Sequence, residues 1–475
     1  MTWLLKAVTG VWLLQLAWRF KRALAVSAVA VFAIAAYGWA GLVLLVVGPP
    51  LLALLWRWVH PWSYWRFVGW LVARHRLRTT YGLRWAEVMQ SCGLHRPIPG
   101  RPGEFTTPRL VRVTDSPVGD VLHVRLLTGQ EPGDFERQAA ELAHALGAPA
   151  VRVTSAGPGL VELTLVERDV LADAVELHDV EAVTDLRAVR FAVGEDGSWR
   201  TRDYANIAAE VGGGVPGSGK TAGETSLACG LIQNPAVQYV VIDGKGGEDW
   251  SWIAPRAAAY TNEDEDLDVV LELVESVHRL MRARLKTQKT QRGRANFWDL
   301  PLDPAHPAVF LVVDEVQTFT DQKGMDKDTK AVAATITARL SALVKKGRSA
   351  GVITRLLTQK PTSDAIPTAI RDNASVRTAW RVLSDDAAEA ILGPVVRGSA
   401  VTPVDIPVSM PGVAVVADAG GQLERVRFPY VDEHTAEQIA TRTAELRRDL
   451  ADLTGPVPAE DATADESASE QEATA

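Results

Sequence analysis

The chain has 475 residues, 47% of them hydrophobic, and a formal net charge of −8, so it is long enough for two or three domains with at least one sizeable core. The charge is uneven, because the first 86 residues contain ten Lys or Arg and no Asp or Glu, which leaves about −18 for the remainder and excludes a soluble enzyme divided into two similar halves. The two cysteines, Cys92 and Cys229, lie far apart and outside any metal-binding spacing, which excludes a zinc or iron–sulfur centre and leaves nucleotide chemistry as the main candidate.

Residues 1–86 are predicted to form a membrane anchor. Within them, residues 23–56 are a run of 34 residues without a charge. As one helix this run would be about 51 Å long, whereas the hydrocarbon core of a bilayer is about 30 Å thick. We therefore expect two transmembrane helices, with a turn near Gly38 and Gly41. Basic residues flank the run on both sides, so the positive-inside rule predicts a protein of the cytoplasmic membrane with both termini in the cytoplasm.

Two other arrangements of this segment remain open. The sequence Gly48-Pro49-Pro50 could end a single span at residues 24–47, followed by an interfacial helix. The run could also be a buried hairpin of a soluble protein. Ten of the fifteen tryptophans precede Glu87, which favours the membrane arrangements because tryptophan is enriched at membrane interfaces.

Residues 87–104 are predicted to be a linker, and residues 105–187 a small α+β domain. The linker is rich in glycine and proline. In the small domain, alternating apolar residues predict two pairs of strands, at 111–126 and 151–165, with a helix between them that ends at Gly147.

Residues 188–432 are predicted to be an α/β domain. A strand at 189–193 is followed by apolar strands that alternate with helical segments, and this pattern indicates a mostly parallel sheet covered by helices. A C-terminal helix is expected at 433–454. The tail, 455–475, has six acidic residues and no basic ones, a composition that predicts disorder.

A glycine-rich motif carries the strongest functional signal in the chain. It reads Gly214-Val215-Pro216-Gly217-Ser218-Gly219-Lys220-Thr221, a complete match to GxxxxGK[ST], and Ala222 follows it. In such a loop the backbone N–H groups surround the β-phosphate, Lys220 neutralises the β- and γ-phosphates, and Thr221 ligates Mg²⁺. The helix that begins here points its N-terminus at the phosphates, so the motif predicts ATP and Mg²⁺ as cofactors. The strand expected before it, 207–211, is short and contains Glu210, an acid that a buried strand does not normally carry.

A second motif lies about 95 residues later in the chain. It reads Val309-Phe310-Leu311-Val312-Val313-Asp314-Glu315, and predicts a buried strand with two carboxylates at its C-terminal end. Asp314 would hold Mg²⁺, largely through water, and Glu315 would orient and deprotonate the attacking water. The alternative is a buried strand with two acids at its solvent end.

Two further strands end in polar residues. Residues 352–358 lead to Gln359, which could contact the γ-phosphate or could simply be a polar residue at the end of a strand. Residues 239–243 end in Asp243, and Asp243-Gly244-Lys245 could support the site or could form only a turn.

Together, these motifs resemble the FtsK/SpoIIIE branch of the FtsK/HerA superfamily, over residues 109–429. Asp314-Glu315 matches the Walker B motif of the family. The segment 241–245 resembles its IDPK strand, with glycine in place of proline. The more specific likeness is to the family's RAxG…TQRP signature, which here reads Arg348-Ser349-Ala350-Gly351 followed by Thr358-Gln359-Lys360-Pro361.

The resemblance implies a RecA-like P-loop ATPase core that forms a homo-hexameric ring, with ATP between subunits and double-stranded DNA in the central pore. It also implies that Gln359 is a γ-phosphate sensor and that an arginine from the neighbouring subunit, namely Arg348, Arg371 or Arg377, stabilises the transition state. Membrane-anchored members of this family occur on conjugative plasmids and integrative elements of actinobacteria. The resemblance therefore predicts a membrane-anchored, ATP-driven double-stranded DNA translocase for conjugative transfer.

Three other functions remain open: a chromosome segregation translocase, a type VII-like protein-secretion ATPase, and a nonhydrolytic membrane scaffold. No winged-helix module is recognisable after the motor, which weighs against the reading of DNA orientation sequences. The single P-loop favours DNA over protein secretion, and the intact motifs argue against a scaffold. DNA contacts would come from seven basic residues within 279–294 and from Lys345-Lys346-Gly347-Arg348, unless these residues form only a solvated helix face.

Overall fold

The computed structural model describes residues 77–98, 100–101, 103–116, 118–167, 169–360, 368–399, 401–418 and 420–454, with scattered positions between 38 and 59. Most of the predicted transmembrane hairpin and all of the predicted acidic tail lie outside these residues. Within them, no helix is both long enough and apolar enough to cross a membrane. The chain forms two compact units, residues 1–168 and 169–475.

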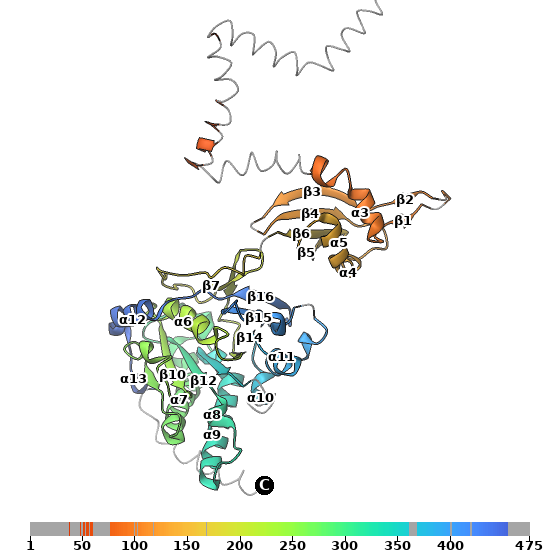
Figure 1. The fold of residues 1–475 in the computed structure, drawn as a ribbon. Helices are drawn as coiled ribbons and strands as arrows, with labels where there is room; N and C mark the ends of the chain where they lie inside the picture. The colour runs from red at the N-terminus through yellow and green to blue at the C-terminus, as the bar shows by residue number, and fades with distance from the viewer. Residues whose placement is uncertain are drawn as a thin grey trace, which may run out of the picture. The chain divides into compact units, whose positions relative to one another are not determined.

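The first unit is built on a four-stranded antiparallel sheet in the order β3-β4-β6-β5 (Figure 1). Its strands are β3 (Arg109–Asp115), β4 (Asp120–Arg125), β5 (Ala150–Gly157) and β6 (Leu160–Val166). Around the sheet lie the π-helix η1 (Leu77–Tyr81), the helices α3 (Trp85–Ser91), α4 (Pro132–Glu136) and α5 (Ala139–Leu146), and a hairpin of β1 (Arg96–Pro97) and β2 (Phe105–Thr106).

One face of this small sheet carries the core of the first unit. Alternate residues of β6 are buried, and Leu163 shares a cluster with Leu142 of α5 and Trp85 of α3. The strand pairs and the helix expected from the sequence are confirmed. Gly147 ends α5 with a φ of 72°, the left-handed conformation that favours glycine at a helix C-terminus.

The second unit contains one mixed sheet of ten strands in the order β11-β10-β12-β13-β9-β14-β15-β16-β7-β8. The strands are β7 (Val189–Gly194), β8 (Trp199–Arg202), β9 (Ala209–Gly213), β10 (Val237–Asp243), β11 (Ala259–Thr261), β12 (Ala308–Asp314), β13 (Val352–Thr358), β14 (Val376–Trp380), β15 (Val413–Ala417) and β16 (Leu423–Arg427). The run from β11 to β14 is parallel. The other four strands are antiparallel to their neighbours, so the mostly parallel sheet expected from the sequence describes only the part from β11 to β14.

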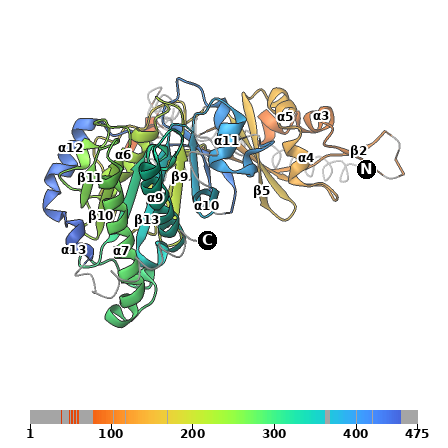
Figure 2. The same cartoon turned by 90° about the horizontal axis from the view of Figure 1, so that it is seen from below.

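Helices cover both faces of this sheet. They are α6 (Lys220–Leu231), α7 (Leu267–Arg292), α8 (Gln317–Thr320), α9 (Lys327–Lys346), α10 (Thr368–Arg371), α11 (Asp385–Leu392), α12 (Glu433–Arg442) and α13 (Leu450–Thr454), with short 3₁₀ turns that include η4 (Arg348–Ala350) and η7 (Ala444–Leu446). On one face α7 and α9 lie side by side and share a core cluster with Ile242 and Leu311 (Figure 2). On the other face α6 and α12 pack against Val241 and Phe310. Because successive strand residues point to opposite faces, this alternation explains why the central strands are apolar throughout.

The segment 169–187 belongs to the second unit, although the sequence placed it in the small domain at 105–187. Backbone hydrogen bonds hold it there. Tyr430 N donates to Val175 O (2.8 Å), and Val183 N donates to Gly230 O (3.0 Å). These bonds join residues far apart in the sequence, so no local pattern could have located the boundary.

The helix expected at 433–454 is divided into α12, η7 and α13. Arg447 has an extended backbone conformation that interrupts the helix. The next residue, Arg448, donates its backbone N–H to Gln238 Oε1 of β10 (3.2 Å) rather than to a helical carbonyl. A tertiary contact with the sheet therefore replaces the local helix at this point.

Candidate active site

The proposed phosphate loop and the proposed acid pair lie at the same edge of the parallel sheet, but not on neighbouring strands. The loop follows β9 and the acids end β12, and β13 lies between the two strands. β13 therefore separates the strand that leads to the loop from the strand that carries the acids. Because all three strands are parallel, Gln359 at the end of β13 lies between the loop and the acids.

The glycine-rich loop has the backbone that its sequence predicts. Gly217 and Gly219 have φ values of 75° and 91°, in the left-handed region, and Gly219 directly precedes α6. The loop is also held from outside, since Gly412 N donates to Ser218 O (2.9 Å). A Cβ at Gly219 would lie 2.2 Å from Gly412 N, so both conformation and space require glycine there. Ser218 Oγ is buried and has no hydrogen-bond partner among the described residues.

The lysine of the loop reaches the two acids. Lys220 Nζ forms a close ion pair with Asp314 Oδ1 and lies 3.1 Å from Glu315 Oε1. All three side chains are buried, with exposed fractions of 3%, 3% and 8%. A buried ammonium group and two buried carboxylates therefore come together from segments 94 and 95 residues apart.

A tryptophan that sequence reasoning missed fixes Asp314. Trp250 is fully buried, and its Nε1 donates a hydrogen bond of 3.0 Å to Asp314 Oδ2. Asp314 Oδ1 also accepts from the backbone N of Glu315 (3.0 Å). Both carboxylate oxygens are thus oriented by donors. Nothing in the sequence around Trp250 distinguishes it from an ordinary core aromatic residue, so no pattern could have predicted this contact.

Glu315 has an unusual backbone conformation. Its φ is 51°, and it is the one non-glycine residue with a positive φ in the described part of the chain. A left-handed glutamate costs on the order of 1–3 kcal/mol, and such strain concentrates at functional sites. The bend places Glu315 Oε2 within 2.9 Å of the backbone N of Gln359 and close to Gln317 Nε2, both of which donate to it. Gln359 is therefore linked to the acid through its main chain, which leaves its side chain available.

Asp243 and Gly244 support Asp314 from the other side. Asp243 is paired in register with Asp314 on the neighbouring strand, and burial raises its pKa to about 6. Gly244 N donates to Asp314 O (2.9 Å), a bond that proline could not make. A Cβ at Gly244 would also lie 2.7 Å from Phe319. These contacts explain the glycine that replaces proline in the IDPK-like segment.

Glu210, the acid inside the strand before the loop, belongs to a buried ionic network. Arg355 of β13 forms close ion pairs with Glu210 and with Glu224 of α6, and donates to Tyr204 Oη (2.8 Å). Arg202 of β8 lies 3.0 Å from Glu210 Oε1 and stacks on a phenylalanine ring. The four charged side chains, all at most 5% exposed, carry two positive and two negative charges.

This network connects the parts of the site. Glu210 lies four residues before the loop, Glu224 lies four residues after Lys220, and Arg355 lies four residues before Gln359. The arginine thus holds together the strand and helix that flank the loop and the strand that carries Gln359. Desolvation raises the pKa of Glu224, and the charge of Arg355 opposes this rise.

The three candidate arginines occupy different environments. Arg348 is exposed in η4, at the start of β13, and hence at the sheet edge opposite Gln359. Arg377 is half-buried, and its Nη1 donates to Leu392 O (3.1 Å). Arg371 lines a cavity of about 670 Å³ beside the loop, together with Val215 and Lys360. Arg371 therefore lies near the site of its own chain, whereas Arg348 lies away from it.

Two of the seven basic residues at 279–294, Arg284 and Arg292, have structural contacts. Arg284 donates to Ala350 O (2.9 Å) and to Pro307 O (2.8 Å), and burial lowers its pKa to about 10. Arg279, Arg282 and Lys289 of α7 are exposed. Arg292 is 12% exposed, and its guanidinium lies 3.9 Å from Asp303 and over the ring of Phe297. The basic segment is thus a largely solvated helix face with two partly buried arginines.

Comparisons with known proteins agree with the motifs. A family model described as the actinomycete conjugal transfer protein N-terminal domain matches residues 52–167. The transfer protein TraSA of Streptomyces ambofaciens is 30% identical over 399 residues, which cover 79% of this chain and 94% of that protein. A sporulation regulatory protein of Streptomyces azureus is 28% identical over 240 residues, covering 50% of this chain and 77% of that protein. The solved structure of the pCW3 conjugation coupling protein TcpA, a monomer form with ATPγS, has a TM-score of 0.51 at 19% sequence identity. The match covers 72% of this chain and 94% of that chain, and this likeness shows the fold.

Proposed function

We propose that this chain, which belongs to the family of actinomycete conjugal transfer proteins that includes TraSA, is an ATPase that moves double-stranded DNA during conjugation. The observation that carries the proposal is the meeting of Lys220 with Asp314 and Glu315 at one sheet edge, beside a loop with two left-handed glycines. Family membership supports the transfer of DNA, and the geometry of the site supports ATP hydrolysis.

The residues of the loop fit a magnesium–nucleotide complex. The N-terminus of α6 and the backbone N–H groups of the loop would receive the phosphates, and the hydroxyl of Ser218, in the same loop, has no hydrogen-bond partner among the described residues. Thr221 and Asp314 would hold Mg²⁺, which would neutralise charge on the β- and γ-phosphates. The cavity beside Val215 gives room for the remainder of the nucleotide.

Binding of a nucleotide would change the ion-pair partners of Lys220. In the structure its ammonium group pairs with Asp314 and Glu315. Phosphate oxygens would draw Lys220 away, since a charge-assisted contact with phosphate replaces the ion pair. The carboxylate of Glu315 would then be free to accept a proton from the attacking water. Gln359, joined to Glu315 through its backbone N–H, would sense whether the γ-phosphate is present.

The assembly required by this function is also part of the proposal. Residues 1–86 would anchor the chain in the cytoplasmic membrane, and six copies would form a ring around the DNA. Arg348, exposed at the sheet edge opposite its own site, is the best placed of the three arginines to complete the site of a neighbouring subunit. The exposed basic side chains of α7 would contact the DNA backbone independently of the DNA sequence.

The test is the ATP turnover of the full chain in detergent, with and without double-stranded DNA across a salt series. We expect stimulation by DNA that falls as salt rises. Glu315→Gln should abolish turnover, whereas Glu437→Gln, which alters an exposed acid on α12, should not. The proposal would be refuted if ATP turnover did not change on addition of DNA, or if the Glu315→Gln variant retained ATP turnover.

A further inference from the structure

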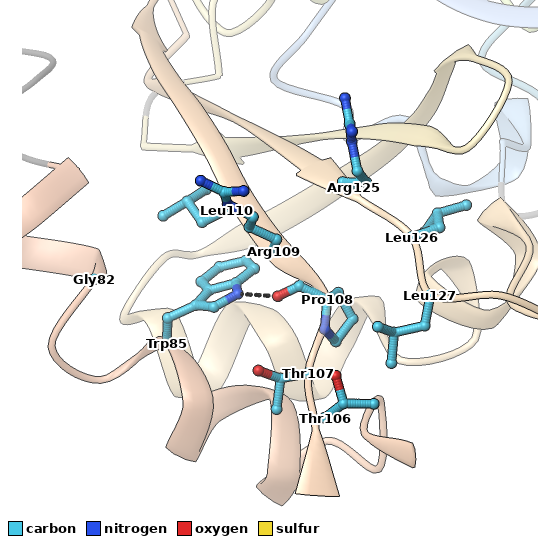
Figure 3. Close-up of a pocket in the computed structure, with 10 residues that line it drawn as sticks. All are labelled: Gly82, Trp85, Thr106, Thr107, Pro108, Arg109, Leu110, Arg125, Leu126 and Leu127. Carbon is cyan, nitrogen blue, oxygen red and sulfur yellow. Dashed lines mark hydrogen bonds between the residues drawn. The ribbon is translucent and has the colours of Figure 1, made fainter. Parts of the chain in front are cut away.

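A pocket opens in the first unit beside the start of α3 (Figure 3). Its volume is about 560 Å³. The residues that matter for its chemistry are Trp85, Thr106, Thr107, Arg109, Arg125 and Leu126. Figure 3 shows the two arginines on the neighbouring strands β3 and β4, above the tryptophan and the threonines.

The positive charges of the two arginines are not compensated by any side chain in the described part of the chain. Arg109 and Arg125 are directly opposite each other in the antiparallel pair of β3 and β4. Like charges in this position destabilise a sheet. Both side chains are exposed, and neither has a hydrogen bond or an ion pair with a residue in the described part of the chain. An anion between them would remove the repulsion.

Some other arginines of the same unit are engaged. Arg101 lies 3.1 Å from Glu104 Oε2, and Arg137 forms a close ion pair with Asp134. Arg96 donates to the carbonyl oxygen of Gly129 (3.3 Å). The side chains of Arg84 and Arg112 are also exposed and have no hydrogen bond or ion pair with a described residue, so Arg109 and Arg125 are set apart by their position opposite each other on neighbouring strands.

The rest of the pocket is apolar and contains hydroxyl groups. The indole of Trp85 forms part of the wall and is fixed by a hydrogen bond of 2.7 Å to Pro108 O. Leu83 and Phe105, each adjacent in sequence to a residue that lines the pocket, are 81% and 44% exposed. Cationic side chains beside exposed apolar and aromatic ones are typical of a surface that lies at a membrane interface.

We propose that this pocket binds the phosphate-bearing headgroup of an anionic membrane lipid. The two guanidinium groups would hold the phosphate oxygens, and Thr106 and Thr107 could donate hydrogen bonds to the headgroup. Leu83 and Phe105 would contact the boundary of the acyl chains. The site would orient the first unit on the membrane surface, and so the proposal rests on the proposed membrane anchor and not on the ATP site.

The position of the pocket in the chain favours a lipid over DNA. Its wall begins at Gly82 and Trp85, at the end of the basic and tryptophan-rich segment 57–86 that follows the uncharged run predicted to enter the membrane. Duplex DNA, in contrast, requires an extended positive surface. Residues 77–167, the part of the first unit that forms the pocket, contain nine Arg or Lys and ten Asp or Glu and so have no net positive charge to supply one.

The test is native mass spectrometry of the full chain in detergent, with phosphatidylglycerol, phosphatidylcholine, inorganic phosphate or a short duplex added in turn. We expect selective retention of phosphatidylglycerol. The double variant Arg109→Gln/Arg125→Gln should weaken this retention by about 30-fold, from roughly tenfold per 1.4 kcal/mol and about 1 kcal/mol for each arginine. The matched control Arg101→Gln/Arg137→Gln should retain the lipid as the wild type does.

Two further variants separate the lipid site from folding and from catalysis. Arg109→Lys/Arg125→Lys, which preserves the charge, should recover most of the binding. Glu315→Gln should lose ATP turnover and still retain the lipid. Equal retention of the two lipids, an equal loss in the control double variant, or displacement of the lipid by duplex DNA would overturn the proposal. Competition by millimolar inorganic phosphate alone would also overturn it, since the site would then recognise free phosphate and not a lipid.

Discussion

Replacing Arg355 by methionine should destabilise the second unit strongly, because it leaves Glu224 buried without its basic partner. Arg355 is 2% exposed and contacts two carboxylates that are 5% and 4% exposed. Removing one partner of a buried ion pair costs about 3–5 kcal/mol, since the remaining charge has lost the water and the partner that stabilised it. Arg202 still compensates Glu210 in this variant, so the loss falls mainly on Glu224.

A second substitution should recover part of this loss. In Arg355→Met/Glu224→Gln, the remaining pair of Arg202 and Glu210 is balanced, and the buried acid has become neutral. We expect a recovery of about 1–3 kcal/mol, limited by the hydrogen bonds that a buried glutamine requires. The assay is urea unfolding of the full chain in detergent, with Arg282→Met, which alters an exposed arginine of α7, as the control.

The pH dependence of the single variant gives an independent check. Burial raises the folded-state pKa of Glu224, while Arg355 lowers it. Without Arg355 the folded pKa rises further above the unfolded value, so folding is favoured at low pH and this advantage is lost as the pH rises through the folded pKa. Arg355→Met should therefore be more destabilising at pH 8 than at pH 5. An unfolding midpoint equal to that of the wild type, or the same loss at both pH values, would refute this account of the network.

Three more predictions concern the active site. Gly219→Ala should abolish binding of an ATP analogue, measured by fluorescence, because its Cβ would lie 2.2 Å from a backbone nitrogen, whereas Gly129→Ala, at a similar φ of 82° in open space, should retain it. Trp250→Phe removes the donor to Asp314 Oδ2 and should lower kcat by about tenfold, in line with about 1–3 kcal/mol for an unsatisfied buried acceptor, while circular dichroism is unchanged. Gly244→Pro should lower the free energy of unfolding by at least about 1 kcal/mol, read from urea midpoints, because it removes the bond to Asp314 O and crowds a phenylalanine.

Local sequence patterns predicted the elements that carry the chemistry. The strand at 352–358 agrees with β13 at both ends, and the run before Asp314 agrees with β12 to within a residue. These strands are buried on both faces, so their apolar runs are continuous and their ends are marked by the first polar residue. The glycine-rich loop could also be predicted from the sequence, because its left-handed backbone favours glycine at Gly217 and Gly219.

The relations between these elements could not be predicted in the same way. No local signal states that β13 lies between β9 and β12, because strand order is set by long-range packing. The contact of Trp250 with Asp314 joins residues 64 positions apart, and the pairing of Arg355 with Glu210 joins residues 145 positions apart. Glu210 therefore looked anomalous in the sequence, although its partners make it compatible with a buried strand.

The charge balance of the two buried clusters distinguishes their roles. In the network around Arg355, two basic and two acidic side chains compensate each other, so the cluster is complete without a ligand. At the sheet edge, Lys220 faces both Asp314 and Glu315, and one formal negative charge remains uncompensated in a buried place. An excess of buried negative charge is costly unless a cation is present, and a divalent ion with its phosphate ligands meets that requirement. The same residue types thus form a structural cluster where their charges are equal, whereas the unequal charges at the sheet edge fit the proposed site for magnesium and nucleotide.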